Sequence, residues 1–248
     1  MNNQQDSRVS GMSLNRRSFL TTLGVATAAG LLGFTPDSNL AYADALSKEQ
    51  REKMTPDEII GYAKMGNERF RAGLRKNRDF LREQMTSAKG QHPAAVVLSC
   101  VDSRAPAEII LDLGIGDMFN SRVAGNIANE DILGSLEFAC AVAGSKVVLV
   151  MGHTACGAIK GAIDKVQLGH LTGLLEKIRP AVEATQYDGE RTSKNDAFVN
   201  AVARKNVELT IAGIRAKSPL LKELETKGSI KIVGTMYDLG TAGIEFIS

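Results

Sequence analysis

Short apolar runs of strand length alternate along the chain with longer stretches in which apolar residues recur at helical spacing. Residues 94–99 (AAVVLS) follow a proline and are apolar over most of their length, as in a parallel strand that is buried on both faces. Further runs of this kind predict strands over 117–123, 146–151 and 230–234. Because helical stretches separate these strands, the sequence predicts the α/β class, with a mostly parallel central sheet of four to five strands flanked by helices.

Helix signals occupy the intervals between these strands. Thr55 before Pro56 predicts a helix start with threonine as the N-cap, and the apolar spacing extends this helix to about residue 72. We expect further helices over 129–143 with an asparagine cap, from 154–155 onward, and at about 170–185, 195–217 and 219–227. No internal repeat or low-complexity linker follows residue 44, so we expect an N-terminal helical arm over 44–90 and an α/β core over 91–248, together in one domain.

The first 43 residues have the pattern of an export signal. Arg16 and Arg17 precede Ser-Phe-Leu and a mildly apolar run over 20–34, which predicts a twin-arginine signal. Residues 41–43 (AYA) offer the small side chains that a signal peptidase accepts. An uncleaved membrane anchor is the alternative, but the run of about 15 residues is shorter than the roughly 20 that span a bilayer. We therefore expect residues 1–43 to be removed and the protein to be periplasmic or otherwise exported, without stable membrane insertion.

The charge balance and the low aromatic content argue against a nucleic-acid partner. The 248 residues include 30 Lys+Arg and 28 Asp+Glu, with a net charge of +2, 5% aromatic residues and no Trp. Such a chain offers neither a basic surface that follows phosphates nor a platform for stacking bases, so we expect no nucleic-acid partner. Its 3 cysteines are too few for a disulfide scaffold and too far apart for a zinc ribbon.

Candidate metal ligands follow two of the predicted strands. Cys100 comes directly after the first strand, and the third strand leads into His153 and Cys156. The carboxyl ends of parallel strands meet at one edge of a sheet, and His-x-x-Cys fits a helix start, where residues three apart lie on the same side. Two thiolates and one imidazole suit zinc, and three protein ligands leave a fourth position for water. The sequence therefore predicts an open zinc site for hydrolysis or hydration.

Each of these residues also has a simpler interpretation. Cys100 and Cys156 could form a disulfide in an oxidising compartment, and His153 could be a buried core histidine with satisfied hydrogen bonds. The joint occurrence of a glycine-flanked His-x-x-Cys and a second cysteine segment favours the metal site. Cys140 lies within an apolar helical run, FACAVA, and is interpreted as a small buried side chain.

Asp102 and Arg104 lie close to the first candidate ligand. Two thiolates cancel the double charge of zinc, so the metal acidifies its water less than it would with neutral ligands. A carboxylate that accepts a hydrogen bond would orient this water if Arg104 keeps Asp102 ionised and fixed through a bidentate pair. The alternative is a surface ion pair worth about 0–1 kcal/mol. We expect both residues to be catalytic.

The segments CVDSR and GHTACG, joined by EIILDLGIGDMFNSRVAGN, resemble a β-class carbonic anhydrase. The resemblance is close from about residue 90 to 162 and looser at the C-terminal strand. It implies reversible hydration of carbon dioxide to bicarbonate and a proton, with one zinc ion per subunit. It also implies that Gln91 binds substrate, usually across a dimer interface, and that Gly157 offers its backbone N–H to the bound anion.

The same resemblance implies a homodimer or a dimer of dimers. Members of the family pair through N-terminal helices, so the amphipathic stretch 56–72 is a candidate arm that reaches a second subunit. The alternative is that this stretch packs within its own core. Two other functions remain open: a related zinc hydrolase of carbonyl sulfide or carbon disulfide, and a non-catalytic bicarbonate-binding homologue. The presence of both Asp102 and Arg104 favours an enzyme.

Arg122 and Tyr237 align with two members of an Arg–Tyr–Trp bicarbonate pocket that an allosteric branch of the family contains. Val97 stands at the Trp position, and the chain has no Trp. We therefore expect an open zinc site rather than a closed form in which Asp102 is the fourth ligand, and a structural ion pair for Arg122.

Overall fold

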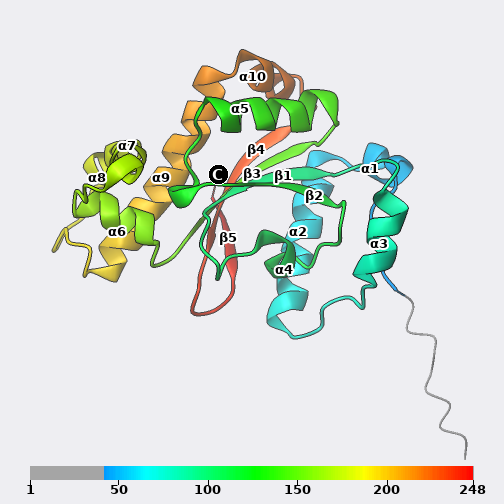
Figure 1. The fold of residues 1–248 in the computed structure, drawn as a ribbon, viewed down its shortest axis with the longest axis horizontal. Coiled ribbons are helices and arrows are strands. Elements are labelled where there is room, and N and C mark those ends of the chain that lie inside the picture. Colours follow the sequence, from blue (N-terminus) through cyan, green and yellow to red (C-terminus); the bar gives the residue numbers. More distant parts are fainter. Residues whose placement is uncertain (1–41, 248) are drawn as a thin grey trace, which may run out of the picture. The chain divides into compact units, whose positions relative to one another are not determined.

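A five-stranded sheet with the order β2-β1-β3-β4-β5 forms the centre of the protein (Figure 1). The computed structural model describes residues 42–247, so the predicted export signal over 1–43 lies almost entirely outside the described residues. The strands are β1 Ala95–Ser99, β2 Met118–Arg122, β3 Val147–His153, β4 Lys231–Tyr237 and β5 Ile244–Ile247. The first four are parallel to one another and β5 is antiparallel to β4. The predicted α/β class with a mostly parallel sheet is confirmed.

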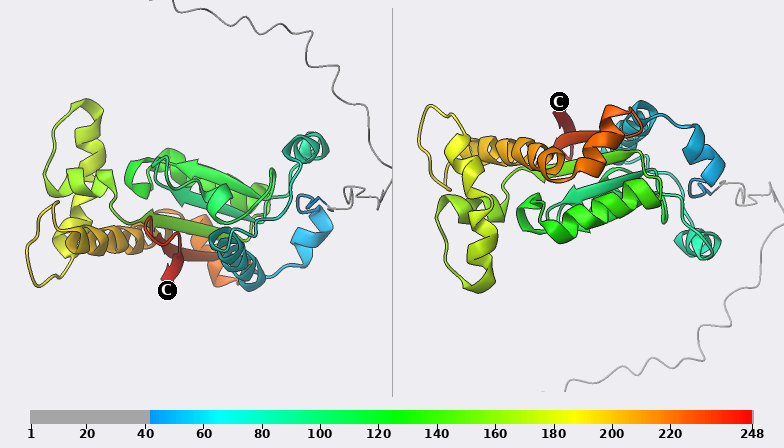
Figure 2. Two further views of the ribbon diagram at one scale, coloured as in Figure 1. Left: turned by 90° about the horizontal axis from the view of Figure 1, so that it is seen from below. Right: turned by 90° about the horizontal axis from the view of Figure 1, so that it is seen from above.

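Helices cover both faces of this sheet. They are α1 Lys48–Lys53, α2 Pro56–Arg71, α3 Phe80–Ser87, α4 Ala107–Ile110, α5 Glu130–Glu137, α6 Gly157–Ile163, α7 Gly169–Glu176, α8 Arg179–Ala184, α9 Asp196–Lys217 and α10 Pro219–Thr226, with a short 3-10 turn η1 Ala124–Asn126 and a π-helical turn η2 Phe138–Val142. In Figure 1, α5, α9 and α10 lie on one side of the sheet, and α2 and α4 lie on the other. Figure 2 shows α6, α7 and α8 at the opposite end of this unit from α1 and α3.

The capping residues that the sequence indicates start the helices. Thr55 and Glu58 form a reciprocal capping box, in which each side chain accepts a hydrogen bond from the backbone N–H of the other residue. Pro56 occupies the first position of α2, as predicted. Asn129 accepts the N–H of Ile132 at 2.9 Å and so caps α5.

Strands β3 and β4 extend further than the sequence predicts. They pair over seven positions, from Val147 with Lys231 to His153 with Tyr237. Gly152 is typical of a loop, yet here it lies inside the strand and pairs with Met236. The position requires glycine because a Cβ atom there would stand 2.7 Å from Cγ2 of Val207 on α9. Strand β5, a short antiparallel edge strand, is not predicted by the pattern.

Alternate side chains of the strands enter two apolar layers. Val96 and Leu98 pack with α9 on one face, whereas Val97 packs with Ile59 of α2 on the other. Helix α2 thus packs its apolar side within its own subunit, as the core-packing alternative predicts, and its role as an arm that reaches a second subunit stays a prediction. Within residues 42–247 no helix combines the length and apolar character that a membrane span requires.

A buried ion-pair network joins the helical arm to the core. Nη1 of Arg78 lies 2.7 Å from Oε1 of Glu83, and Nη2 lies 3.6 Å from Oδ2 of Asp117, with each of these side chains only 1% exposed. Oε2 of Glu83 also accepts the backbone N–H of Ile115 at 2.9 Å. The segment before β2 is therefore held against α3 by charges that water does not screen.

Substitution of Glu83 tests this network. We expect Glu83→Leu to lower the free energy of unfolding by about 3–5 kcal/mol, because it leaves Arg78 as a poorly compensated buried charge. Urea denaturation with linear extrapolation measures the change. Glu223→Leu is the control, since Glu223 pairs with Lys227 on the exposed surface, and its effect should be too small to resolve. Equal losses in the two variants would contradict the expectation.

Candidate metal centre

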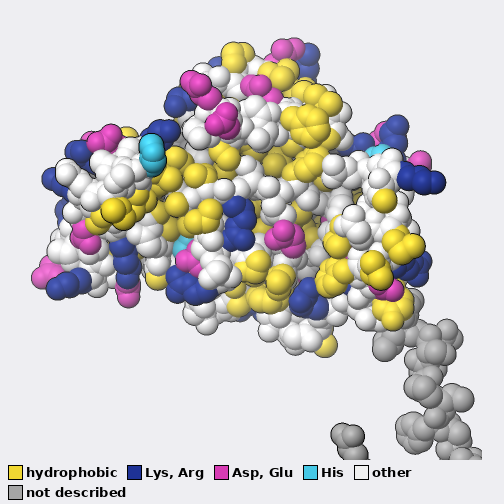
Figure 3. All heavy atoms as spheres, in the orientation of Figure 1, with side chains coloured by type: hydrophobic (Ala, Val, Ile, Leu, Met, Phe, Trp, Pro, Cys, Tyr) yellow, Lys and Arg dark blue, Asp and Glu magenta, His cyan; other side chains and the backbone are white. Residues whose placement is uncertain are grey.

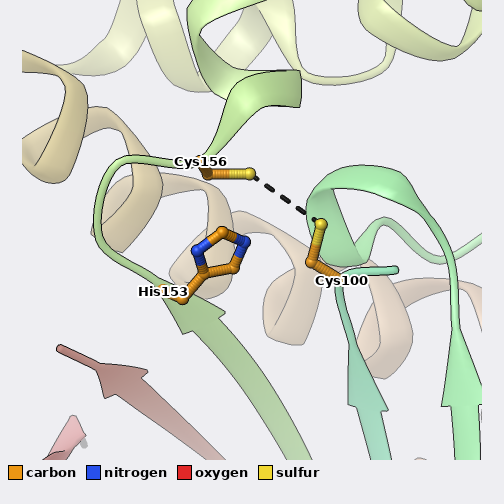
Figure 4. Close-up of side chains that lie close together, drawn as sticks. All are labelled: Cys100, His153 and Cys156. Carbon is orange, nitrogen blue, oxygen red and sulfur yellow. Dashed lines mark hydrogen bonds between the residues drawn. The ribbon is translucent and has the colours of Figure 1, made fainter. Parts of the chain in front are cut away.

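Three side chains from two neighbouring strand ends converge at one edge of the sheet. Cys100 follows β1, His153 is the last residue of β3, and Cys156 precedes α6 (Figure 4). Their ligand atoms all lie within 4.8 Å of one another. The three residues are 4%, 1% and 1% exposed, respectively. The structure thus brings the predicted ligand set together in a buried place.

The local geometry of His-x-x-Cys differs from the predicted helix start. His153 belongs to β3, α6 begins only at Gly157, and Cys156 is the N-cap residue. Between them, Ala155 has a left-handed backbone with φ of 51°. Its N–H donates to Oδ1 of Asn200 at 2.9 Å. A tight turn held by α9, and not helical periodicity, therefore brings the imidazole and the second thiol together.

The imidazole of His153 is oriented for a ligand. Its Nδ1 lies 2.8 Å from the carbonyl oxygen of Thr154, which can only accept, so the proton resides on Nδ1. Nε2 is buried and has no hydrogen-bond partner within residues 42–247. A buried nitrogen of this kind is unfavourable unless something binds it. Together with two sulfur atoms, this lone pair fits a zinc ion.

The thiols of Cys100 and Cys156 differ in acidity. The pKa of Cys100 is lowered to about 4, chiefly because Cys156 donates a hydrogen bond to its sulfur, and the N–H of Gly125 donates a further one. The pKa of Cys156 is raised by the same bond to Cys100 and by burial. Cys100 is accordingly the more readily ionised sulfur, and a bound dication favours loss of the second proton.

All three cysteines are free. The sulfur atoms of Cys100 and Cys156 are 3.9 Å apart, well beyond the roughly 2.05 Å of a disulfide bond. The disulfide alternative is therefore not what the structure adopts. Cys140 is 6% exposed, and burial raises its pKa to about 12, which confirms its interpretation as a buried side chain.

Asp102 and Arg104 form a forked ion pair beside the ligands. Oδ1 and Oδ2 of Asp102 accept hydrogen bonds from Nε and Nη2 of Arg104 at 3.0 and 2.8 Å, respectively. These bonds are the main cause that lowers the pKa of Asp102 to about 2. Oδ2 of Asp102 lies 3.8 Å from Nε2 of His153. The carboxylate is thus ionised, fixed and next to the three ligands, and its catalytic role remains a prediction.

Arg122 does not form the ion pair that we expected. It donates from Nε to the carbonyl oxygen of Cys100 at 2.9 Å and from Nη2 to that of Asp102 at 2.5 Å. No carboxylate of residues 42–247 lies within salt-bridge distance of it. Arg122 therefore fixes the backbone that carries one ligand and the dyad. Tyr237, on β4, is only 4% exposed, and burial raises its pKa.

The two predicted substrate-binding residues lie at different ends of the sheet. Gly157 directly follows Cys156 and is exposed, with open space around it. Gln91 is also exposed, but it precedes β1, whereas Cys100 follows it. The five residues of the strand separate the two by about 16 Å. Gln91 therefore does not join the site of its own subunit.

Two supporting residues are not predicted by the sequence. Asn200 holds the turn between His153 and Cys156, as described above, and Gly125 donates its N–H to Sγ of Cys100 at 3.4 Å. Gly125 lies in the stretch that joins the two motifs of the resemblance, and Asn200 lies in an ordinary helical pattern, but neither position indicates these contacts. A glycine and two asparagines around η1 (AGNIAN) are the only signal that a special turn follows β2.

Comparison with known proteins points to one family. A family model described as carbonic anhydrase matches residues 95–244. Carbonic anhydrase 2 of Mycobacterium tuberculosis is 37% identical over 182 residues, which are 71% of this chain and 85% of that protein. The carbonic anhydrase of Mycolicibacterium smegmatis is 34% identical over 191 residues, 75% of this chain and 90% of that protein. A solved β-carbonic anhydrase of Aspergillus fumigatus has a TM-score of 0.59 and 28% identity, with coverage of 68% of this chain and 81% of that one.

Proposed function

The chain belongs to the β-class carbonic anhydrase family, and we propose that it hydrates carbon dioxide with a zinc ion held by Cys100, His153 and Cys156. The reaction converts carbon dioxide and water reversibly to bicarbonate and a proton. The observation that carries the proposal is the buried Nε2 of His153, which lies beside two sulfur atoms and has no hydrogen-bond partner in the described part of the chain. A zinc ion held there would supply the Lewis acidity that makes water nucleophilic.

The ligands are prepared for this ion by their surroundings. His153 offers Nε2 because Nδ1–H donates to a backbone carbonyl oxygen. Cys100 loses its proton readily because hydrogen bonds to its sulfur stabilise the thiolate. The turn at Ala155 keeps Cys156 on the same side as His153. Two negative charges and one neutral ligand then balance the charge of a divalent cation.

Asp102 orients the attacking water. Its carboxylate can only accept hydrogen bonds when ionised, and Arg104 keeps it ionised and fixed. A water that donates to Asp102 turns its lone pair toward the carbon of carbon dioxide. The new C–O bond gives bicarbonate, and the released proton passes to solvent. We expect the N–H of Gly157, which directly follows Cys156, to bind an oxygen of the bicarbonate.

The alternative functions have less support. The relatives reported above are carbonic anhydrases rather than hydrolases of carbonyl sulfide or carbon disulfide. A non-catalytic bicarbonate-binding homologue has no need of a carboxylate held beside the ligands, whereas Asp102 is held there by Arg104.

Stopped-flow measurement of carbon dioxide hydration tests the proposed function. We expect the purified protein to contain one zinc ion per subunit and to lose activity when a chelator removes it. Asp102→Asn should retain the metal yet react about 100-fold more slowly or worse, because the attacking water loses its charged acceptor. Cys140→Ser is the control, and we expect its zinc content and rate to match the wild type. A wild-type protein without zinc, or an Asp102→Asn variant with unchanged rate, would contradict the proposal.

We also propose that the chain forms a homodimer or a dimer of dimers. Figure 3 shows apolar side chains on the face over α3 and α4. Leu81 and Met85, one turn apart on α3, are 71% and 70% exposed. Phe80 lines a surface groove with Ile109 beside the edge strand β2. Exposed apolar groups next to a free strand edge favour a second subunit on this face. In such a dimer, we expect Gln91 of the partner subunit to reach the metal centre described above.

Light scattering tests the oligomer. We expect the mass of two or four subunits for the wild type and a smaller mass for Leu81→Glu, because a buried carboxylate opposes association. Leu168→Glu is the matched control, since Leu168 is 67% exposed and lies at the start of α7. A monomeric wild type would exclude the dimer.

Finally, we propose that residues 1–43 are a cleaved twin-arginine export signal. Arg16 and Arg17 before a mildly apolar run support it. Cell fractionation of a Gram-negative host should recover the shortened protein from the periplasm. Joint Arg16→Lys and Arg17→Lys substitution should leave the full-length chain in the cytoplasm, because the twin-arginine export machinery recognises the paired arginines. Unchanged export of that variant would refute the assignment.

A further inference from the structure

Helix α9 carries one amide where its neighbours are apolar. The buried residues of its sheet-facing side include Val202, Ala203, Val207 and Ile211, and among them Asn206 is only 3% exposed. An amide in such a layer is unfavourable unless it is hydrogen-bonded. Asn206 therefore has a specific partner to satisfy.

That partner belongs to the turn after β2. Nδ2 of Asn206 donates to the carbonyl oxygen of Gly125 at 2.7 Å, a buried contact across 81 positions of the sequence. Gly125 has a φ of 68°, and a Cβ atom there would stand 2.5 Å from Cδ1 of Ile178. Only glycine satisfies both conditions, so the turn has one backbone arrangement and Asn206 holds it from α9.

The other side of Gly125 faces a metal ligand. Its N–H donates to Sγ of Cys100 at 3.4 Å, and this contact is also buried. The carbonyl group and the N–H of Gly125 flank the same Cα atom, so a bond that fixes the first also limits the direction of the second. An unbroken chain of contacts thus runs from Asn206 through Gly125 to the sulfur of Cys100.

We propose that Asn206 is a positioning residue that holds the N–H of Gly125 on the thiolate of Cys100. This role presupposes the zinc site proposed above. A hydrogen bond to a thiolate withdraws electron density from the sulfur, so less of it reaches the metal. In a site with two anionic sulfur ligands, this withdrawal preserves Lewis acidity that the thiolates would otherwise reduce. Asn206 thereby acts on the metal without touching it.

Cobalt(II) substitution of the full chain tests this inference, because sulfur-to-cobalt charge transfer reports the electron density on the ligand. Asn206→Leu keeps a branched side chain and removes the donor. We expect its charge-transfer band at longer wavelength than the wild-type band, since a thiolate without its hydrogen bond gives up an electron more easily. We also expect zinc binding about 10–100-fold weaker in competition with a chelator.

Ile214→Val is the matched control. Ile214 lies on the same buried side of α9, about two turns beyond Asn206. We expect this variant to lower stability but to leave the charge-transfer band unchanged. If Asn206→Leu does not fold, Asn206→Ala removes the same donor, and the same displacement of the band is expected of it.

The outcomes separate this inference from the proposed function. A wild type that binds neither cobalt nor zinc overturns both. A wild type that binds cobalt, with the band of the Asn206 variant unshifted, overturns the inference alone and leaves the zinc site intact. Weaker zinc binding without a displaced band also overturns it, because Asn206 would then support only the fold.

Discussion

The pairing of β1 with β3 is the constraint on which the site depends. The two strands are parallel and adjacent, with Ser99 opposite Met151. Cys100 therefore leaves the sheet one position after this pair, and His153 ends its strand two positions after it. The hydrogen bonds between the two strands therefore fix where the backbone presents Cys100 and His153. A register shift by one residue would move the imidazole to the other face and dissolve the cluster.

The charges around this edge are arranged by two arginines on different elements. Arg104 binds the carboxylate of Asp102, whereas Arg122 binds the carbonyl oxygens of Cys100 and Asp102. One guanidinium thus fixes the side chain and the other fixes the backbone of the same short loop. Because Arg122 belongs to the edge strand β2, the loop is tied to the sheet rather than left to the solvent.

Much of the site can be predicted from the sequence because the relevant signals are local. Cys100, His153 and Cys156 come at or after the ends of predicted strands. Because the ends of parallel strands meet at one edge of the sheet, the three side chains are expected to lie close together. For the residues that refine the geometry, the local sequence does not show which contacts they make. Asn206 is an ordinary helix residue by pattern, and Gly125 is an ordinary loop glycine, until the fold joins them across 81 positions. The bonds of Arg122 to backbone oxygens are equally invisible, because an arginine in a sequence suggests a carboxylate partner and not a carbonyl group.

Gly152 of β3 is the position at which the sheet packs closely against α9, the helix that carries Asn206. A side chain at this position would collide with Val207, the residue after Asn206, and with Sδ of Met236 at 2.9 Å. Displacement of α9 to relieve the collision would draw Asn206 away from Gly125. Genome surveys that score only the cysteine, histidine and aspartate motifs would still accept such a chain as complete. The glycine immediately before the histidine is therefore a useful additional criterion when intact enzymes are separated from decayed copies.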